Sequence, residues 1–137
     1  AWLAIDARRF PDEAAPVQFL GPGTARESLK AVAGFRGAIL NTGMSVVATG
    51  AWGCGAFNGD PEVKALIQWA AASEAGVTTL LYHCWDDAAT AAALARLATL
   101  GKTCSVQQLW NAAITVASKA TSDPEAVGSV ADRGSFL

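Results

Sequence analysis

The chain has 137 residues, of which 52% are hydrophobic and 16% are charged, and this balance excludes an intrinsically disordered protein. Its formal net charge is −2, with 10 basic and 12 acidic residues, and Lys and Arg form no run. These numbers argue against direct DNA or RNA binding, because a nucleic-acid groove needs clustered Lys and Arg.

The three cysteines, Cys54, Cys84 and Cys104, form no C-x-x-C pair. This spacing indicates neither a disulfide framework nor a zinc site, and it is typical of reduced thiols in an intracellular protein, nuclear or cytoplasmic. No apolar run reaches the roughly 18 residues of a membrane helix. The N-terminus does not resemble a signal peptide. We therefore expect no membrane partner and no bound metal.

The first third of the chain predicts a strand, a loop and a helix. Residues 2–7 are apolar and predict a short buried strand. A Pro- and Gly-rich loop follows. Thr24 and Glu27 have the spacing of a capping box, and apolar residues at helical spacing continue to Leu40, with Gly43 as the expected end.

The central part predicts strand, glycine loop, helix and strand. Residues 46–49 form the expected strand, and Asp60 is the expected N-cap of a helix that starts at Pro61 and closes at Gly76. Residues 77–85 are β-branched and apolar, which is typical of a strand buried on both faces.

Two more helices are expected near the C-terminus. Asp86 or Asp87 would cap an Ala-rich helix that ends near residue 100, and a capping box at Ser105 and Gln108 would start a helix to about residue 119. Residues 121–137 are expected to form a loosely held tail. Alternating strands and helices predict one α/β domain with a parallel or mixed sheet and helices on both faces.

Four glycines, Gly50, Gly53, Gly55 and Gly59, lie between the second strand and its helix. A glycine-rich turn of this kind directs backbone N–H groups and a helix N-terminus at an anion such as a diphosphate. The P-loop pattern is absent, because Asp60 and Pro61 follow where Lys and Ser or Thr would be needed. A loose dinucleotide-binding loop, a macrodomain loop and a simple tight crossover all remain open from spacing alone.

The whole stretch "VVATGAWGCGAFNGDPEVKALIQ" resembles the diphosphate-binding segment of the poly(ADP-ribose) glycohydrolases, ATGNWGCGAFGGD followed by LKxLIQ. "IDARRF" and "TLLYHCWDD" are similar to two further strands of that family, so the resemblance extends from about residue 2 to about residue 115. It implies the C-terminal part of a single catalytic domain over residues 1–137. The implied fold is a macrodomain-like three-layer α/β/α arrangement with a mixed or parallel central sheet.

The resemblance also implies the substrate-binding residues. The diphosphate contacts carry over to residues 51–56, Phe57 would pack beside the distal ribose, and Trp85 stands where the family has the aromatic that stacks on adenine. These positions are Ala51, Trp52, Gly53, Cys54, Gly55, Ala56, Phe57 and Trp85. Two positions depart from the pattern: Ala51 replaces an Asn and Asn58 replaces a Gly. Packing of Trp85 in the core is the alternative.

The catalytic signature of the family, a Gly-Gly-Gly loop followed by Gln-Glu-Glu, does not occur in this chain. Hydrolysis of a ribose–ribose bond needs a carboxylic acid that protonates the leaving oxygen. The carboxylates Asp12, Glu13, Glu62, Asp86 and Asp87 offer no convincing substitute. We therefore expect no catalytic residue here, and expect the general acid on an upstream N-terminal half of the domain, present as a separate polypeptide, which agrees with the abrupt apolar N-terminus.

Three other hypotheses stay open at this stage. The chain could be an ADP-ribose-binding module without catalysis, or a Rossmann-type fragment that binds NAD(P). Cys54 with His83 as its base is a weaker possibility, because the two lie on different elements. The poly(ADP-ribose) glycohydrolase hypothesis requires neither a metal nor a redox cofactor.

Overall fold

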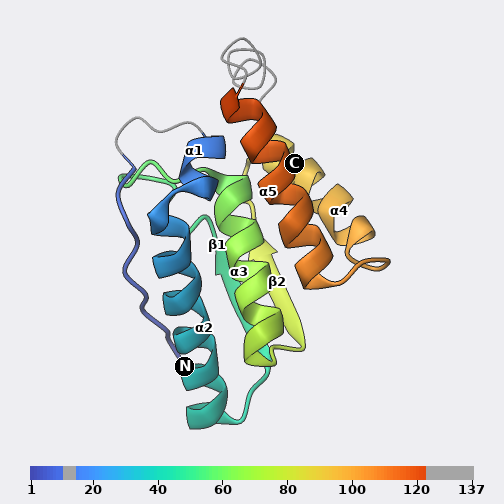
Figure 1. Cartoon of the computed structure of the whole chain (residues 1–137). Helices are drawn as coiled ribbons and strands as arrows, with labels where there is room; N and C mark the ends of the chain where they lie inside the picture. Colours follow the sequence, from blue (N-terminus) through green and yellow to red (C-terminus); the bar gives the residue numbers. More distant parts are fainter. Residues whose placement is uncertain (11–14, 123–137) are drawn as a thin grey trace.

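The computed structural model describes residues 1–10 and 15–122 (Figure 1). The fold is mixed α/β, mostly helical, with a small parallel sheet of two strands. The elements in chain order are α1 (Ala15–Leu20), α2 (Pro22–Thr42), β1 (Val46–Gly50), α3 (Pro61–Ala75), β2 (Thr79–His83), α4 (Ala88–Leu100) and α5 (Val106–Ser122).

Helix α3 begins and ends as the sequence predicts. The Asp60 carboxylate accepts hydrogen bonds from the backbone N–H groups of Glu62 (3.0 Å) and Val63 (2.9 Å), and Pro61 occupies the first turn. Gly76 closes the helix with a left-handed φ of 86°. The direction of the chain as it enters α3 from the glycine loop is therefore fixed by local chemistry.

The start of α2 differs from the prediction. The helix begins at Pro22, after Gly21, and no side chain caps it. The Thr24 hydroxyl donates instead to the Gln18 carbonyl (2.7 Å), and Glu27 is buried in contacts with other elements. The predicted capping box at Thr24 and Glu27 is therefore wrong, because tertiary partners take both side chains. Gly43 ends the helix as expected, with a φ of 68°.

Within the described ranges, strand β1 pairs only with β2, in parallel, from Val46 opposite Thr79 to Gly50 opposite His83. Figure 1 shows α2 and α3 on the same side of this sheet. On the other side Val46 and Leu81 are 49% and 50% exposed, so β2 is not buried on both faces. Among the described residues, helices therefore cover one face of the sheet, and the second helical layer of the expected fold is not present.

Residues 2–7 do not form the predicted buried strand. The segment is extended and mostly exposed, it runs beside α2 in Figure 1, and Trp2 is fully exposed rather than in the core. Its polar groups bind elsewhere than β1: the Asp6 carboxylate pairs with Arg26 and Lys30 of α2. Contacts with α2 have thus replaced pairing with the sheet.

Helix α3 lies at the centre of the core. One cluster joins it to α1, α4 and α5 through Phe19, Val63, Leu66, Ile67, Leu97, Ala113 and Ala117. A second cluster joins it to α2 through Ala31, Phe35, Ala71 and Ala72. Trp69 and Trp110 are partly buried against the first cluster. The core therefore anchors the helix that follows the glycine loop.

The two C-terminal helices have the predicted caps. Asp87 accepts from the Thr90 N–H at the start of α4, and Ser105 and Gln108 form a reciprocal capping box before α5. Helix α5 continues to Ser122, so residues 121 and 122 of the predicted tail are helical. The rest of that tail lies outside the described residues.

Candidate functional site

The glycine loop connects β1 to α3 beyond the carboxyl ends of both strands, the place where open α/β sheets bind ligands. Short turn bonds shape it: the Trp52 N–H donates to the Gly50 carbonyl (2.7 Å), and the Cys54 N–H donates to that of Ala51 (3.1 Å). The Gly59 N–H closes the loop on the Gly53 carbonyl (2.9 Å). The loop is therefore an ordered series of turns.

Several backbone N–H groups of this loop donate to no other group in the described part of the chain. They belong to Gly53, Gly55, Ala56 and Phe57, next to the N-terminus of α3. Backbone N–H groups that lack an intramolecular acceptor and sit at the positive end of a helix dipole suit an anionic ligand. The amides of Trp52 and Cys54, also predicted to bind substrate, are already used in turn bonds.

The glycines of the loop serve two different purposes. Gly53 has a φ of +78°, and a Cβ there would lie 2.7 Å from the Ala7 Cβ. A Cβ at Gly59 would lie 2.8 Å from both the Gly53 carbonyl oxygen and the Lys64 Cε. Gly55 has ordinary φ, and a Cβ there would meet nothing within 4 Å. Gly53 and Gly59 are thus required by internal packing, whereas Gly55 faces open space.

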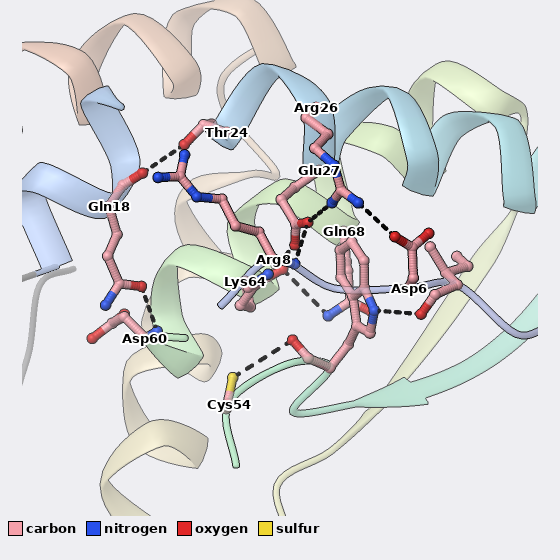
Figure 2. A network of polar contacts seen from close by, with 12 residues as sticks. Asp6, Arg8, Gln18, Thr24, Arg26, Glu27, Cys54, Asp60, Lys64 and Gln68 are labelled. Carbon is pink, nitrogen blue, oxygen red and sulfur yellow. Dashed lines mark hydrogen bonds and ion pairs between the residues drawn. The ribbon is translucent and has the colours of Figure 1, made fainter. Parts of the chain in front are cut away.

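Two buried glutamines bind the ends of the loop, and Figure 2 shows one of them, Gln18, bonded to Asp60. At the start, the Gln68 amide accepts from the Thr49 hydroxyl (2.5 Å) and donates to the Gly50 carbonyl (3.1 Å). At the end, Gln18 of α1 donates to the Asn58 carbonyl (3.1 Å) and accepts from the Asp60 N–H (2.8 Å). The sequence interpretation did not identify Gln18, since nothing in its surroundings distinguishes it from a surface residue of a loop.

An ion pair lies underneath the loop. The Lys64 ammonium of α3 contacts the Glu27 carboxylate of α2, and it lies 4.4 Å from the centre of the Trp52 ring. The Trp52 indole N–H donates to the Ile5 carbonyl (2.9 Å). The Trp52 side chain is therefore turned toward the interior.

Two exposed aromatic side chains flank the loop. Trp85, just after β2, is 89% exposed, and a Cβ at Gly50 would lie 3.9 Å from its Nε1. Its φ of 52° is a left-handed conformation that a bulky residue seldom adopts, and such strain is concentrated at functional sites. Phe57, at the other end of the loop, is 45% exposed. The core-packing alternative for Trp85 is wrong.

The titratable groups around the loop do not form a nucleophilic centre. Burial raises the pKa of Cys54 to about 12, against a smaller opposing effect of Lys64, so the thiol stays protonated near neutral pH. His83 is exposed on β2, and no hydrogen bond joins it to Cys54 in the described structure. Burial also raises the pKa of Tyr82, whose buried hydroxyl has no hydrogen-bond partner within residues 1–10 and 15–122.

The carboxylates near the loop already have structural roles. Asp60 caps α3, and its pKa is raised by burial despite the two hydrogen bonds that it accepts. Asp87 caps α4, and the Thr90 hydroxyl lowers its pKa. Glu62 is buried in the first turn of α3. Asp12 and Glu13 lie outside the described residues, and no group of three metal-ligating side chains gathers in the part of the chain that is described.

No helix in the described ranges is both long and apolar enough to cross a bilayer.

Comparison with known proteins gives short, strong similarities. Over 37 residues the chain is 54% identical to "Probable poly(ADP-ribose) glycohydrolase 2" and 60% identical to "Poly(ADP-ribose) glycohydrolase 1", both from Arabidopsis thaliana. Each match covers 27% of this chain and 7% of the relative, so the chain aligns with a small part of those proteins.

A family model described as poly(ADP-ribose) glycohydrolase (PARG), macro domain fold, matches residues 1–92, which include the glycine loop, α3, β2 and Trp85. The matched range ends inside α4, whereas the resemblance in the sequence suggested an extent to about residue 115. Since the match covers more than half of the chain, this protein belongs to the poly(ADP-ribose) glycohydrolase family.

Proposed function

We propose that this chain supplies the diphosphate- and adenine-binding part of a glycohydrolase domain that cleaves ribose–ribose O-glycosidic bonds in poly(ADP-ribose) and releases ADP-ribose. The observation that carries the proposal is the set of N–H groups at Gly53, Gly55, Ala56 and Phe57, which find no acceptor within residues 1–10 and 15–122 and lie beside the N-terminus of α3. Gly55 leaves room for a phosphate to approach this backbone closely.

The flanking aromatics give the proposed ligand a direction. Trp85 lies near the first residue of the loop, and its exposed indole provides a flat apolar surface for adenine. Phe57 lies at the far end, where it would pack beside the distal ribose. The loop between them then holds the two phosphates, with Ala51 at the position where the resembling family pattern has Asn. In this arrangement the chain binds and orients the substrate.

The chemical step needs a group that this chain does not offer among its described residues. A carboxylic acid must protonate the leaving ribose oxygen while positive charge develops on the sugar. Asp60 and Asp87 are helix caps, and Glu62 lies in the first turn of α3. We place the general acid on an upstream half of the domain, a separate polypeptide that packs on the open face of the sheet at Val46 and Leu81 and completes the α/β/α layers.

The proposal has one consequence for cofactors and one for cellular location. Acid catalysis on a glycosidic bond needs neither a metal nor a redox cofactor, so the proposal includes none. The three cysteines are unpaired in the described structure, which suits the reducing interior of the cell, nucleus or cytoplasm.

Titration calorimetry with ADP-ribose tests the binding role. Gly55→Val should weaken binding by at least about tenfold, because its side chain fills the space reserved for the phosphates, and it should leave the melting temperature unchanged. Gly37→Val is the matched control, since a Cβ at Gly37 also meets nothing and the residue lies in α2, away from the loop. Equal affinity of wild type and Gly55→Val would rule out the diphosphate role.

An ADP-ribose-binding module without catalysis is the second candidate. It is favoured because the carboxylates of Asp60 and Asp87 already cap helices. Release of ADP-ribose from the polymer should occur only when the upstream half is added to this chain. If the mixture binds polymer and releases nothing, the binding module is the function. Membership of a macro domain family argues against the Rossmann-type NAD(P) fragment, and thermal stabilisation by NADPH without stabilisation by ADP-ribose would reverse that conclusion.

A further inference from the structure

We propose that Glu27 and Lys64 are positioning residues that keep the glycine loop in its ligand-binding conformation. The inference rests on the proposed diphosphate role of the loop. Neither residue faces the ligand side: their side chains are 0% and 1% exposed. They act through the backbone of Gly53 and Gly59 and through the Trp52 ring.

The pair joins three parts of the chain that are distant in sequence (Figure 2). Glu27 Oε1 accepts from the Arg8 backbone N–H (2.8 Å) and from the Arg26 guanidinium (2.8 Å), while Oε2 contacts the Lys64 ammonium. Glu27 therefore ties the N-terminal segment and α2 to α3. Satisfying a buried carboxylate in this way fixes the mutual position of the elements that supply its donors.

Lys64 transmits this position to the loop by contact. A Cβ at Gly53 would lie 3.2 Å from its ammonium nitrogen, and one at Gly59 would lie 2.8 Å from its Cε. The ammonium also lies 4.4 Å from the Trp52 ring centre and 5.3 Å from that of Phe10. The side chain thus fills the space directly beneath the bond that joins the Gly59 N–H to the Gly53 carbonyl.

The buried position beneath the loop is filled by an ion pair rather than by apolar side chains. Burying two charges brings little or no net stability compared with apolar side chains of the same volume, so stability alone does not explain the pair. What an ion pair adds is a defined geometry, because the ammonium must stay against the carboxylate. The loop needs such a support, since its N–H groups at Gly53, Gly55 and Ala56 would otherwise gain from turning inward to find acceptors.

The surrounding charges do not suggest a direct electrostatic role. Arg26 and Lys30 are paired with Asp6, and Asp60 and Glu62 lie close to the loop at the start of α3. Glu27 and the nearby acidic groups therefore offset the positive charge of Lys64, and the effect of Lys64 on the ligand is a matter of loop shape.

The test uses the double variant Glu27→Gln/Lys64→Met in the full chain. Gln keeps an acceptor for the Arg8 N–H, and Met keeps the volume of the Lys stem, so no unpaired charge is buried. The matched control is Arg36→Met/Glu74→Gln, which removes an exposed ion pair (2.9 Å) that also joins α2 to α3, away from the loop. If the double variant does not fold, Lys64→Met alone serves, since the Glu27 carboxylate then keeps the Arg8 N–H and the Arg26 guanidinium as donors.

Hydrogen exchange of the Gly59 N–H measures how stably the loop is closed in the absence of ligand. We expect it to exchange at least about tenfold faster in the double variant than in the control, because its bond to Gly53 loses its support. Binding reads the function: affinity for ADP-ribose should fall at least about tenfold, and affinity for adenosine, which touches only Trp85, should stay within about twofold.

The outcomes separate the two proposals. If the wild type does not bind ADP-ribose, the proposed function fails, while Gly59 exchange still tests the pair. If the wild type binds and the variant matches the control in both exchange and ADP-ribose affinity, the positioning role is wrong. An equal loss of adenosine and ADP-ribose affinity would also overturn it, since that pattern indicates general destabilisation.

Discussion

Replacing Gly53 by Ala should destabilise the protein and replacing Gly55 by Ala should not, although the two glycines are separated by a single residue. At Gly53 the new Cβ would sit on a backbone with φ +78° and lie 2.7 Å from the Ala7 Cβ. The left-handed conformation costs about 1–2 kcal/mol for a residue with a Cβ, and overpacking costs about 1–3 kcal/mol more. The free energy of unfolding should therefore fall by roughly 2–5 kcal/mol.

At Gly55 the same substitution meets no atom within 4 Å and no positive φ. The unfolded chain loses conformational freedom, so Gly55→Ala should leave the stability unchanged or raise it by up to about 1 kcal/mol. Urea denaturation, followed by Trp fluorescence, measures both variants against wild type. A melting temperature lower by roughly 8–20 °C is expected for Gly53→Ala alone. Equal stability of the two variants would refute the assignment of Gly53 to packing and of Gly55 to an open surface.

Three further predictions concern the neighbourhood of the loop. Trp85→Ala should weaken ADP-ribose binding by roughly 1–3 kcal/mol in calorimetry. It should leave the melting temperature unchanged or higher, because the indole is exposed on a strained backbone. A lower melting temperature with intact affinity would show that Trp85 serves packing instead. Tyr82→Phe should leave the free energy of unfolding in urea unchanged or raise it by up to about 1 kcal/mol, since the buried hydroxyl has no partner in the described structure, and a loss of stability would reveal one. Iodoacetamide should modify Cys54 about tenfold faster per pH unit from pH 7 to 10, because a thiol with a pKa of about 12 gains thiolate over that whole range. Peptide mass spectrometry measures the modification rate, and a rate that reaches a plateau below pH 9 would contradict the raised pKa.

The parts of the fold that the sequence predicts correctly depend on neighbouring residues alone. Asp60, Pro61 and Gly76 start and end α3 through bonds within a turn, and Asp87 starts α4 in the same way. The glycine loop between β1 and α3 could be placed for the same reason. The order of the helices and strands along the chain follows from the alternation of strand and helix patterns.

The errors arise where distant residues compete for the same groups. Residues 2–7 have the composition of a strand, but the Asp6 carboxylate finds Arg26 and Lys30 on α2, and the segment lies there instead. Residues 15–20 were expected in a loop and form α1. The capping box at Thr24 failed because Gln18 and Lys64 take its two side chains.

The candidate site divides in the same way. The loop and Trp85 could be identified from local pattern and resemblance, whereas Gln18, Glu27 and Lys64 could not. Their importance comes from burial against elements distant in sequence, and a Lys or Gln on a helix is otherwise a surface residue. Which loop glycines serve packing depends on the positions of Ala7 and Lys64, which lie outside the loop.

The central place of α3 ties ligand affinity to global unfolding. The helix contributes to both apolar clusters, and the loop cannot leave its position without disturbing Asp60 at its first turn. A ligand on the loop therefore binds only the native state, and at a hundred times its dissociation constant it adds about 2.7 kcal/mol to the unfolding free energy. By the same linkage, any substitution in the interior that populates the denatured ensemble lowers the apparent affinity without touching the loop.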